Sequence, residues 1–210
     1  MATEHRDHPI FARYFDRLSR AIEPDLGAYR RELLAGLTGR VVEIGAGNGI
    51  NFAHYPPGVA EVIAIEPEPF LRARAQEAAR AAAVSVSVRD GVGARLDLPD
   101  DSVDAAVACL VLCSVPDPAA VLAELRRVVR PGGELRFFEH VRADTPAKAR
   151  VQAWLDRSTL WPRLFGGCRC SRETVGAIAG AGFAIEDVRV ISLKPACSPS
   201  NPHAIGVARA

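Results

Sequence analysis

Short apolar runs alternate with amphipathic stretches along the chain from Arg40 onward. Turn-forming residues bound these runs, and VSVSV at residues 84–88 alternates apolar and polar positions as a β-strand does. The pattern predicts strands at residues 41–44, 62–65, 84–88, 103–109, 134–141, 183–190 and 204–208. It predicts helices at residues 71–83, at about 172–181, and from the Asp117-Pro118 cap to the RPGG stop at residues 130–133.

This alternation predicts an α/β fold with a mostly parallel sheet and helices on both faces. The last two predicted strands lack a long crossover, so one of them should run antiparallel. Residues 142–171, which hold both tryptophans, look more irregular. The first 35 residues place Phe11, Tyr14 and Phe15 on one helix face and are expected to form a flank or lid beside the sheet.

A glycine-rich loop follows the first predicted strand, in the stretch VVEIGAGNGINF at residues 41–52. Glycines let a backbone approach a ligand that a Cβ would block, and this loop faces the crevice where doubly wound sheets bind ligands. Glu66 ends the next strand, 17 residues after Gly49, where a carboxylate can accept both hydroxyls of a ribose. The alternatives are a plain turn for the loop and an exposed strand-end charge for Glu66. The spacing between the glycine loop and Glu66 favours a nucleoside site.

The spacing of the glycines indicates which nucleoside binds. The dinucleotide fingerprint G-x-G-x-x-G would need a glycine at Ile50, whereas this loop reads G-x-G-x-G and follows Glu43. A carboxylate beside the loop repels a pyrophosphate and tolerates a cationic cofactor that carries an ammonium and a sulfonium. The loop therefore favours S-adenosylmethionine over NAD.

These residues resemble the class I S-adenosylmethionine-dependent methyltransferases. The motifs are E-x-G-x-G-x-G at residues 43–49, Glu66-Pro67, DDSVD at 100–104 and LRRVVRPGG at 125–133. A narrower resemblance, to the thiol S-methyltransferases (also called methyltransferase-like protein seven), lies in LVLCSV at 110–115, FEHV at 138–141, FGGCRCSRE at 165–173 and NPHAIG at 201–206. Animal members of that group carry an apolar amino-terminal membrane anchor, which we do not expect in this chain.

The resemblance implies a Rossmann-like, seven-stranded sheet with one antiparallel strand, and a cofactor site built from the strand ends. The residues it implies for the cofactor are Glu43, Gly45, Ala46, Gly47, Gly49, Asn51, Glu66, Pro67, Val92, Gly93 and Cys109. Many relatives contact adenine through an acidic side chain that residues 91–94 do not offer. We therefore expect backbone groups at Val92 and Gly93, or the Asp90 carboxylate, to take that part.

Candidates for the chemistry lie at the same sheet edge. His140, at the end of a strand, could accept a thiol proton, or it could simply hydrogen-bond locally. Four residues are candidates for contact with an acceptor, or for plain packing: Cys113, Trp154, Trp161 and Phe165. The C-x-C motif of Cys168 and Cys170 is a poor metal signal, so no metal is expected.

Composition narrows the class of protein. The 210 residues include 26 basic and 25 acidic ones, so no strong field is available for nucleic acid. There is no apolar stretch of about 18 residues, and no integral membrane association is expected. Five cysteines, an odd number without paired C-x-x-C motifs, favour a reducing, cytoplasmic location. The sequence leaves the oligomeric state open.

We therefore expect an S-adenosylmethionine-dependent methyltransferase that acts on a small molecule, preferably a small lipophilic thiol. Other acceptors stay open: a quinone-type carbon or oxygen, a lipid headgroup, or arsenite. A methyltransferase-like domain that binds without turnover is the remaining alternative. We expect one domain, divided into a flank or lid (1–35), a cofactor-binding core (36–141), a substrate or lid region (142–182) and closing strands (183–210).

Overall fold

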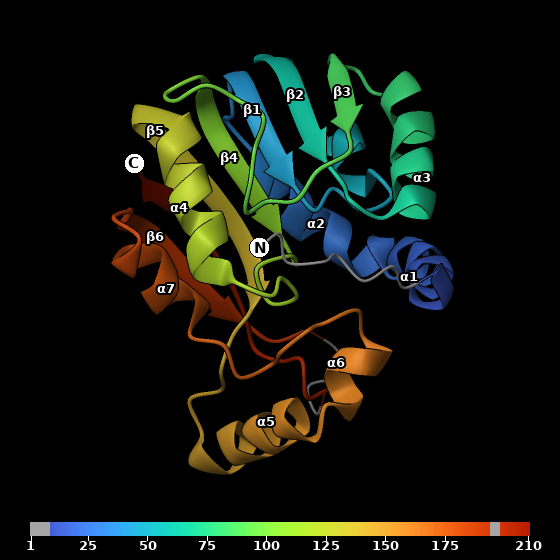
Figure 1. The fold of residues 1–210 in the computed structure, drawn as a ribbon, viewed down its shortest axis with the longest axis vertical. Helices are drawn as coiled ribbons and strands as arrows, with labels where there is room; N and C mark the ends of the chain where they lie inside the picture. Colours follow the sequence, from blue (N-terminus) through green and yellow to red (C-terminus); the bar gives the residue numbers. More distant parts are fainter. Residues whose placement is uncertain (1–8, 194–197) are drawn as a thin grey trace.

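The computed structural model describes residues 9–193 and 198–210, so Cys197 lies outside the described residues (Figure 1). The elements are α1 (Pro9–Ala21), α2 (Glu23–Leu34), β1 (Gly39–Ile44), the 3₁₀ helix η1 (Ile50–His54), β2 (Val59–Ile65), α3 (Pro69–Arg80), β3 (Val86–Arg89), β4 (Val103–Cys109), α4 (Pro118–Val128), β5 (Val129–His140), α5 (Pro146–Ser158), α6 (Leu160–Leu164), α7 (Thr174–Gly180), β6 (Ala184–Ile191) and β7 (His203–Arg209). Each of the seven predicted strands is present, with ends shifted by a few residues.

The seven strands form one sheet in the order β3-β2-β1-β4-β5-β7-β6. Neighbours among β1 to β5 run parallel, whereas β7 lies between β5 and β6 and runs antiparallel to both. The predicted fold class is therefore confirmed. Since the order reverses between β1 and β4, the loops after these two strands meet at the switch point where such sheets bind ligands.

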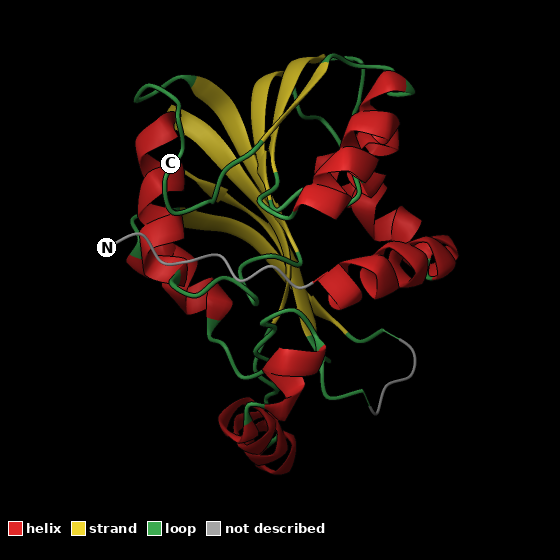
Figure 2. Cartoon of the chain, turned by 45° about the vertical axis from the view of Figure 1, so that its right-hand side comes forward, coloured by secondary structure: helices red, strands yellow, loops and turns green. Residues whose placement is uncertain are grey.

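Helices cover the sheet on both faces (Figure 2). On the face of α4 and α7, the buried core includes Val42, Ile44, Leu122, Leu125 and Ile178. On the face of α2 and α3, it includes Leu33, Val41, Phe52, Val62 and Ala75. Alternate residues of β1 therefore enter opposite cores, as the pleat of a strand requires. Both faces being buried explains why the strands read as continuous apolar runs.

Residues 142–171 differ from the expectation of an irregular stretch, because they contain α5 and α6. These helices lie beyond the carboxyl ends of β1, β2 and β4 (Figure 1). The buried residues of α5 are Ala149, Gln152 and Asp156, so its inner face is largely polar. A helix with such a face carries no apolar stripe, which is why the hydrophobic pattern missed it.

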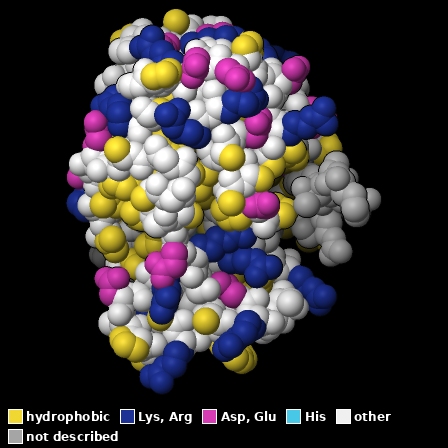
Figure 3. All heavy atoms as spheres, turned by 60° about the vertical axis from the view of Figure 1, so that its left-hand side comes forward, with side chains coloured by type: hydrophobic (Ala, Val, Ile, Leu, Met, Phe, Trp, Pro, Cys, Tyr) yellow, Lys and Arg dark blue, Asp and Glu magenta, His cyan; other side chains and the backbone are white. Residues whose placement is uncertain are grey.

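The surface mixes both signs of charge. Figure 3 shows basic and acidic side chains interspersed on one face, with hydrophobic side chains gathered across its middle. No helix in the described parts of the chain combines the length and hydropathy that a bilayer crossing requires.

Candidate active site

The glycine loop after β1 needs its glycines for two reasons. Gly45, Gly47 and Gly49 have φ values of 59°, 58° and 77°, in the left-handed region that disfavours other residues. A Cβ on Gly45 would lie 2.3 Å from a methyl of Val111, and one on Gly47 would lie 3.2 Å from the ring of Phe15. The loop therefore packs against the β4–α4 loop on one side and against α1 on another.

Glu66, directly after β2, is tied to this loop. Its carboxylate accepts hydrogen bonds from the backbone N–H of Gly47 at 2.8 Å and of Glu68 at 2.9 Å. The side chain is buried, and burial raises the pKa of Glu66 above its ordinary value. Each oxygen accepts only one of these bonds, so each retains a lone pair for a further donor.

Glu43 on β1 is the centre of a buried polar network. Its carboxylate accepts from the Asn51 amide at 2.6 Å and from the Tyr55 hydroxyl at 2.8 Å. Arg30 of α2 donates to Asn51 Oδ1 at 2.7 Å and to Cys109 Sγ at 3.3 Å. Burial raises the pKa of Glu43 to about 7 and that of Cys109 to about 11. The network fixes η1 and the end of β4 around the loop.

Asn48 joins the glycine loop to α1. Its amide donates to Asp16 Oδ1 and to Ser19 Oγ, each at 2.9 Å. Its own Oδ1 is buried and has no hydrogen-bond partner within the described chain. A buried acceptor without a donor is costly, which suggests that a ligand supplies one.

Comparisons with known proteins agree with this geometry. Residues 42–137 match the family described as "Methyltransferase domain". Human Thiol S-methyltransferase TMT1B is 34% identical over 218 residues, covering 95% of this chain and 87% of that protein. Human Thiol S-methyltransferase TMT1A is 33% identical, covering 94% and 85%. This chain belongs to the thiol S-methyltransferase family of S-adenosylmethionine-dependent methyltransferases.

A solved structure supports the fold of this methyltransferase. The S-adenosylmethionine-dependent methyltransferase from Thermotoga maritima superposes with a TM-score of 0.67 at 22% identity, covering 95% of this chain and 97% of that one. At that identity the likeness shows the fold alone.

The residues present fit the cofactor of the family, S-adenosylmethionine. The carboxylate of Glu66 has free lone pairs for ribose hydroxyls, and Asn48 Oδ1 is an unpaired acceptor suited to an ammonium. Gly45 and Gly47 carry no side chain, so their backbone is bare on the loop between β1 and η1. When bound, the cofactor supplies an electrophilic methyl group on a sulfonium.

The other predicted cofactor residues occupy the same edge or support it. Ala46 donates its N–H to Ile65 and accepts from Gly49, while the carbonyl of Pro67 accepts from Arg72. Val92 and Gly93 follow β3, and Asp90 forms an exposed ion pair with Arg72 at 3.0 Å. Adenine contact through these residues stays a prediction.

Glu139 hydrogen-bonds to the β4–α4 loop and not to the His140 ring, among the bonds described. It is fully buried, and its carboxylate accepts the backbone N–H groups of Val111, Leu112 and Cys113 at 2.8, 2.8 and 3.1 Å. His140 is the next residue along β5, and its imidazole makes no hydrogen bond to this carboxylate among those described. This agrees with the alternation of side chains along a strand.

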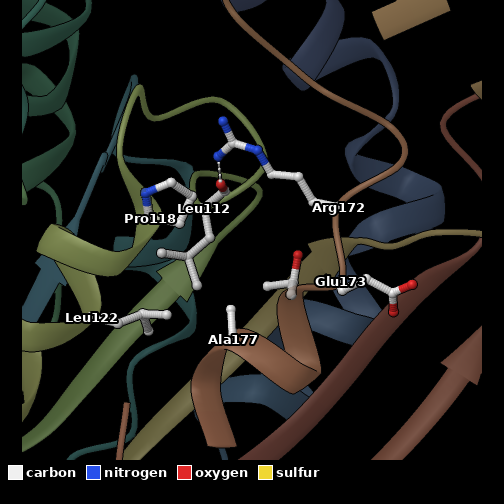
Figure 4. A pocket seen from close by; sticks show the side chains of 7 residues that line it. Leu112, Pro118, Leu122, Arg172, Glu173 and Ala177 are labelled. Carbon is white, nitrogen blue, oxygen red and sulfur yellow. Dashed lines mark hydrogen bonds between the residues drawn. The ribbon is translucent and has the colours of Figure 1, made fainter. Parts of the chain in front are cut away.

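Arg172 holds the carbonyl groups of the same loop. It donates to the backbone carbonyl of Leu112 (Figure 4) and, at 2.6 Å, to that of Val115. A cavity of about 220 Å³ lies beside this contact, lined by Leu112, Pro118, Leu122, Arg172, Glu173, Thr174 and Ala177. It is smaller than the roughly 300 Å³ of a typical ligand pocket. It also has no residue of the glycine loop in its lining.

His140 lies in a cluster of sulfur atoms. Its Nδ1 is 3.2 Å from Cys168 Sγ, and the side chains of Cys113, His140 and Cys168 place their ligand atoms within 4.8 Å of one another. The ring of His203, on the antiparallel partner strand, meets that of His140 at 4.5 Å between centroids. Contact with Cys168, and then burial, raise the pKa of Cys113 well above its ordinary value.

Two of the three predicted aromatic residues join this cluster. Trp161 and Phe165 stack with ring centroids 4.1 Å apart and pack against Cys113, Cys168 and Cys170. Trp154 is 61% exposed on α5 and is not in that cluster, so its role in acceptor binding stays a prediction.

Sequence reasoning missed several residues of the site. The side chains of Arg30, Tyr55 and Asn48 form hydrogen bonds only once the chain is folded, because their partners are up to 79 residues away. Asn48 alone had a cue, because it lies inside the glycine motif. An arginine or tyrosine in a helix or after a turn looks like any other until the fold is known.

Proposed function

We propose that this methyltransferase transfers the methyl group of S-adenosylmethionine to the sulfur of a small lipophilic thiol. The observation that carries the proposal is the position of an apolar, sulfur-rich cluster beside the glycine loop. Val111 packs on Gly45, and two residues further on Cys113 contacts the cluster of Trp161 and Phe165. The human relatives TMT1B and TMT1A, both named thiol S-methyltransferases, support the choice of a thiol.

The reaction asks little of the protein beyond alignment and exclusion of water. The acceptor thiol loses its proton, its sulfur forms a bond to the methyl carbon, and the methyl–sulfonium bond breaks to leave a thioether and S-adenosylhomocysteine. A thiol of pKa roughly 8.5 needs only a small push to ionise near neutral pH. Stacked aromatic residues offer an apolar surface to the rest of the acceptor.

A turnover assay with an acceptor panel tests the proposal. The panel pairs a small uncharged thiol with glutathione, a catechol and an amine, each with the same amount of cofactor. We expect the uncharged thiol to react fastest, because the near-zero net charge offers an anionic thiol little steering. The rate should rise with pH toward the thiol pKa, since the thiolate is the nucleophile. Faster turnover of the catechol or the amine would contradict the proposal.

We also propose that residues 142–182 form the side of the active site that binds the acceptor. A further proposal is that the enzyme works in the cytoplasm. The four described cysteines are free thiols, and three of them belong to one buried cluster, which fits a reducing compartment. Cell fractionation checks the location. Recovery with membranes after a high-salt wash would contradict it.

A further inference from the structure

Three potential metal ligands come together from distant parts of the chain. Cys113 lies in the β4–α4 loop, His140 ends β5, and Cys168 lies between α6 and α7. Their ligand atoms are all within 4.8 Å of one another, and His140 Nδ1 is 3.2 Å from Cys168 Sγ. Ligands bound tetrahedrally at roughly 2.0–2.3 Å lie about 3.3–3.8 Å apart, so a small adjustment would close this set around one ion.

We propose that Cys113, His140 and Cys168 bind a thiophilic divalent cation, zinc by the chemistry of the ligands. Two thiolates and one imidazole are a donor set that zinc takes in proteins. A site of thiolates alone would suit several thiophilic ions, whereas zinc is also suited by imidazole. The imidazole in the set therefore favours zinc.

The surroundings hold the Cys113 ligand in place before any ion binds. Glu139 accepts three N–H groups of its loop, and Arg172 donates to two carbonyls of the same loop. The Cys113 carbonyl accepts the Arg169 N–H at 2.8 Å, which ties the loop to the segment that carries Cys168. Leu110, at the start of the loop, has φ of 57°, a strained conformation that such contacts must maintain.

The other two ligands are also fixed. His140 pairs with His203 across the β5–β7 ladder, and its carbonyl accepts the Thr174 hydroxyl at 3.3 Å. Gly167, beside Cys168, lies so close to the β4–α4 loop that a Cβ there would be 2.7 Å from the Ser114 carbonyl oxygen. These contacts fix the backbone that carries both ligands before an ion binds.

A separate observation points to negative charge on the sulfur atoms. The indole Nε1 of Trp161 is buried and pairs with no nitrogen or oxygen atom among the described residues, and its N–H interacts with the sulfur of Cys168. A buried N–H is costly unless an acceptor faces it, and a metal-bound thiolate is such an acceptor. The oxygens of Glu139 already accept three backbone N–H groups, so this carboxylate is not free to bind the ion.

The cluster lies beside the methyl donor's loop. Phe11 and Phe15 of α1 have ring centroids 5.8 Å apart. A Cβ on Gly166 would meet Phe11, and one on Gly47 would meet Phe15. The segment leading to Cys168 and the glycine loop therefore contact the same face of one helix.

Three protein ligands leave the fourth tetrahedral position open, as in catalytic zinc sites. If the proposed function holds, this position suits the acceptor thiolate, whose deprotonation the zinc would favour. His140 is then a metal ligand, which is neither of the two roles considered from the sequence, a proton acceptor or a local hydrogen-bonding residue. Cys170 is buried against Cys168 but lies outside the set of mutually close ligand atoms.

Metal analysis of the purified, tag-free protein tests the site. We expect about one zinc ion per chain, and a roughly tenfold or greater loss in Cys113→Ser and in Cys168→Ser. Cys109→Ser is the matched control, because this free cysteine lies on the other side of the site against Arg30 and should leave the zinc content unchanged. Wild-type protein without zinc, or variants that retain it, would overturn the proposal.

Cobalt binding to the wild-type enzyme tests the proposed metal site without any variant, so the result does not depend on whether the variants fold. We expect sulfur-to-cobalt charge-transfer bands and tetrahedral d–d bands when Co²⁺ is added to metal-free protein. A Cys113–Cys168 disulfide in freshly purified protein, or binding of arsenite without displacement of zinc, would overturn the proposal. Zinc content is measured without turnover, so it stays informative even if the acceptor is not a thiol. A change of the cobalt spectrum on adding the small thiol would support the open position.

Discussion

Replacing Glu66 with glutamine tests the ribose contact with the smallest change of shape. Glu66→Gln keeps the length of the side chain but turns one oxygen into an NH₂ group, which cannot accept a hydrogen bond. The N–H of Gly47 or of Glu68 then loses its acceptor. An unpaired buried donor costs roughly 1–3 kcal/mol, so the free energy of unfolding should fall by about that amount.

The effect on cofactor binding is separate. A hydrogen bond to a charged acceptor contributes roughly 1.5–3 kcal/mol, and the glutamine loses the charge and one acceptor. This predicts that S-adenosylmethionine binds roughly tenfold to hundredfold more weakly. Isothermal titration calorimetry measures the affinity, and chemical denaturation measures the stability.

Glu68→Gln is the matched control. Glu68 is also buried, but its side chain caps α3 by accepting the Leu71 N–H at 2.7 Å. The glutamine keeps an amide oxygen that can still accept this N–H, so the variant should lose little stability and leave cofactor affinity nearly unchanged. Equal affinities for wild type and folded Glu66→Gln would refute the ribose assignment, as would an equal loss in both variants.

Two further predictions concern the same site. Burial disfavours the ionised form of Glu43 and raises its pKa to about 7, against an ordinary 4.5. The contribution of Glu43 to the free energy of unfolding therefore falls by roughly 3 kcal/mol as pH rises from 4.5 through 7. Glu43→Gln should remove that fall, and denaturation of both proteins at about pH 4.5 and pH 8 checks it; parallel curves would contradict it. Gly47→Ala and Gly36→Ala should each lose about 1–2 kcal/mol, because both positions have positive φ. Only Gly47→Ala should also weaken cofactor binding, since a Cβ at Gly36 meets nothing within 4 Å; calorimetry that finds equal affinities would contradict this.

The strands and the glycine loop were predictable because local pattern determines them. A buried parallel strand such as β1 reads as an apolar run, and a left-handed loop at Gly45, Gly47 and Gly49 shows as spaced glycines. The start of α4 was also readable, since Asp117 caps it by accepting the Ala120 N–H.

The helix α5 and the cysteine cluster were not predictable from the sequence, each for a different reason. In α5 the inward side chains Gln152 and Asp156 are polar, so the usual apolar stripe is missing. The cluster takes one residue each from positions 113, 140 and 168, and only the fold brings them together. The local C-x-C motif gives little indication of a metal site, since the cluster uses only Cys168 of that motif.

A crystal structure with bound S-adenosylhomocysteine is the most direct test of the cofactor site. We expect ribose hydroxyls on the Glu66 carboxylate and the homocysteine portion against the backbone of Gly45 and Gly47, with its ammonium within reach of Asn48 Oδ1. Electron density for the ligand away from this loop, or a ribose held by another carboxylate, would contradict it.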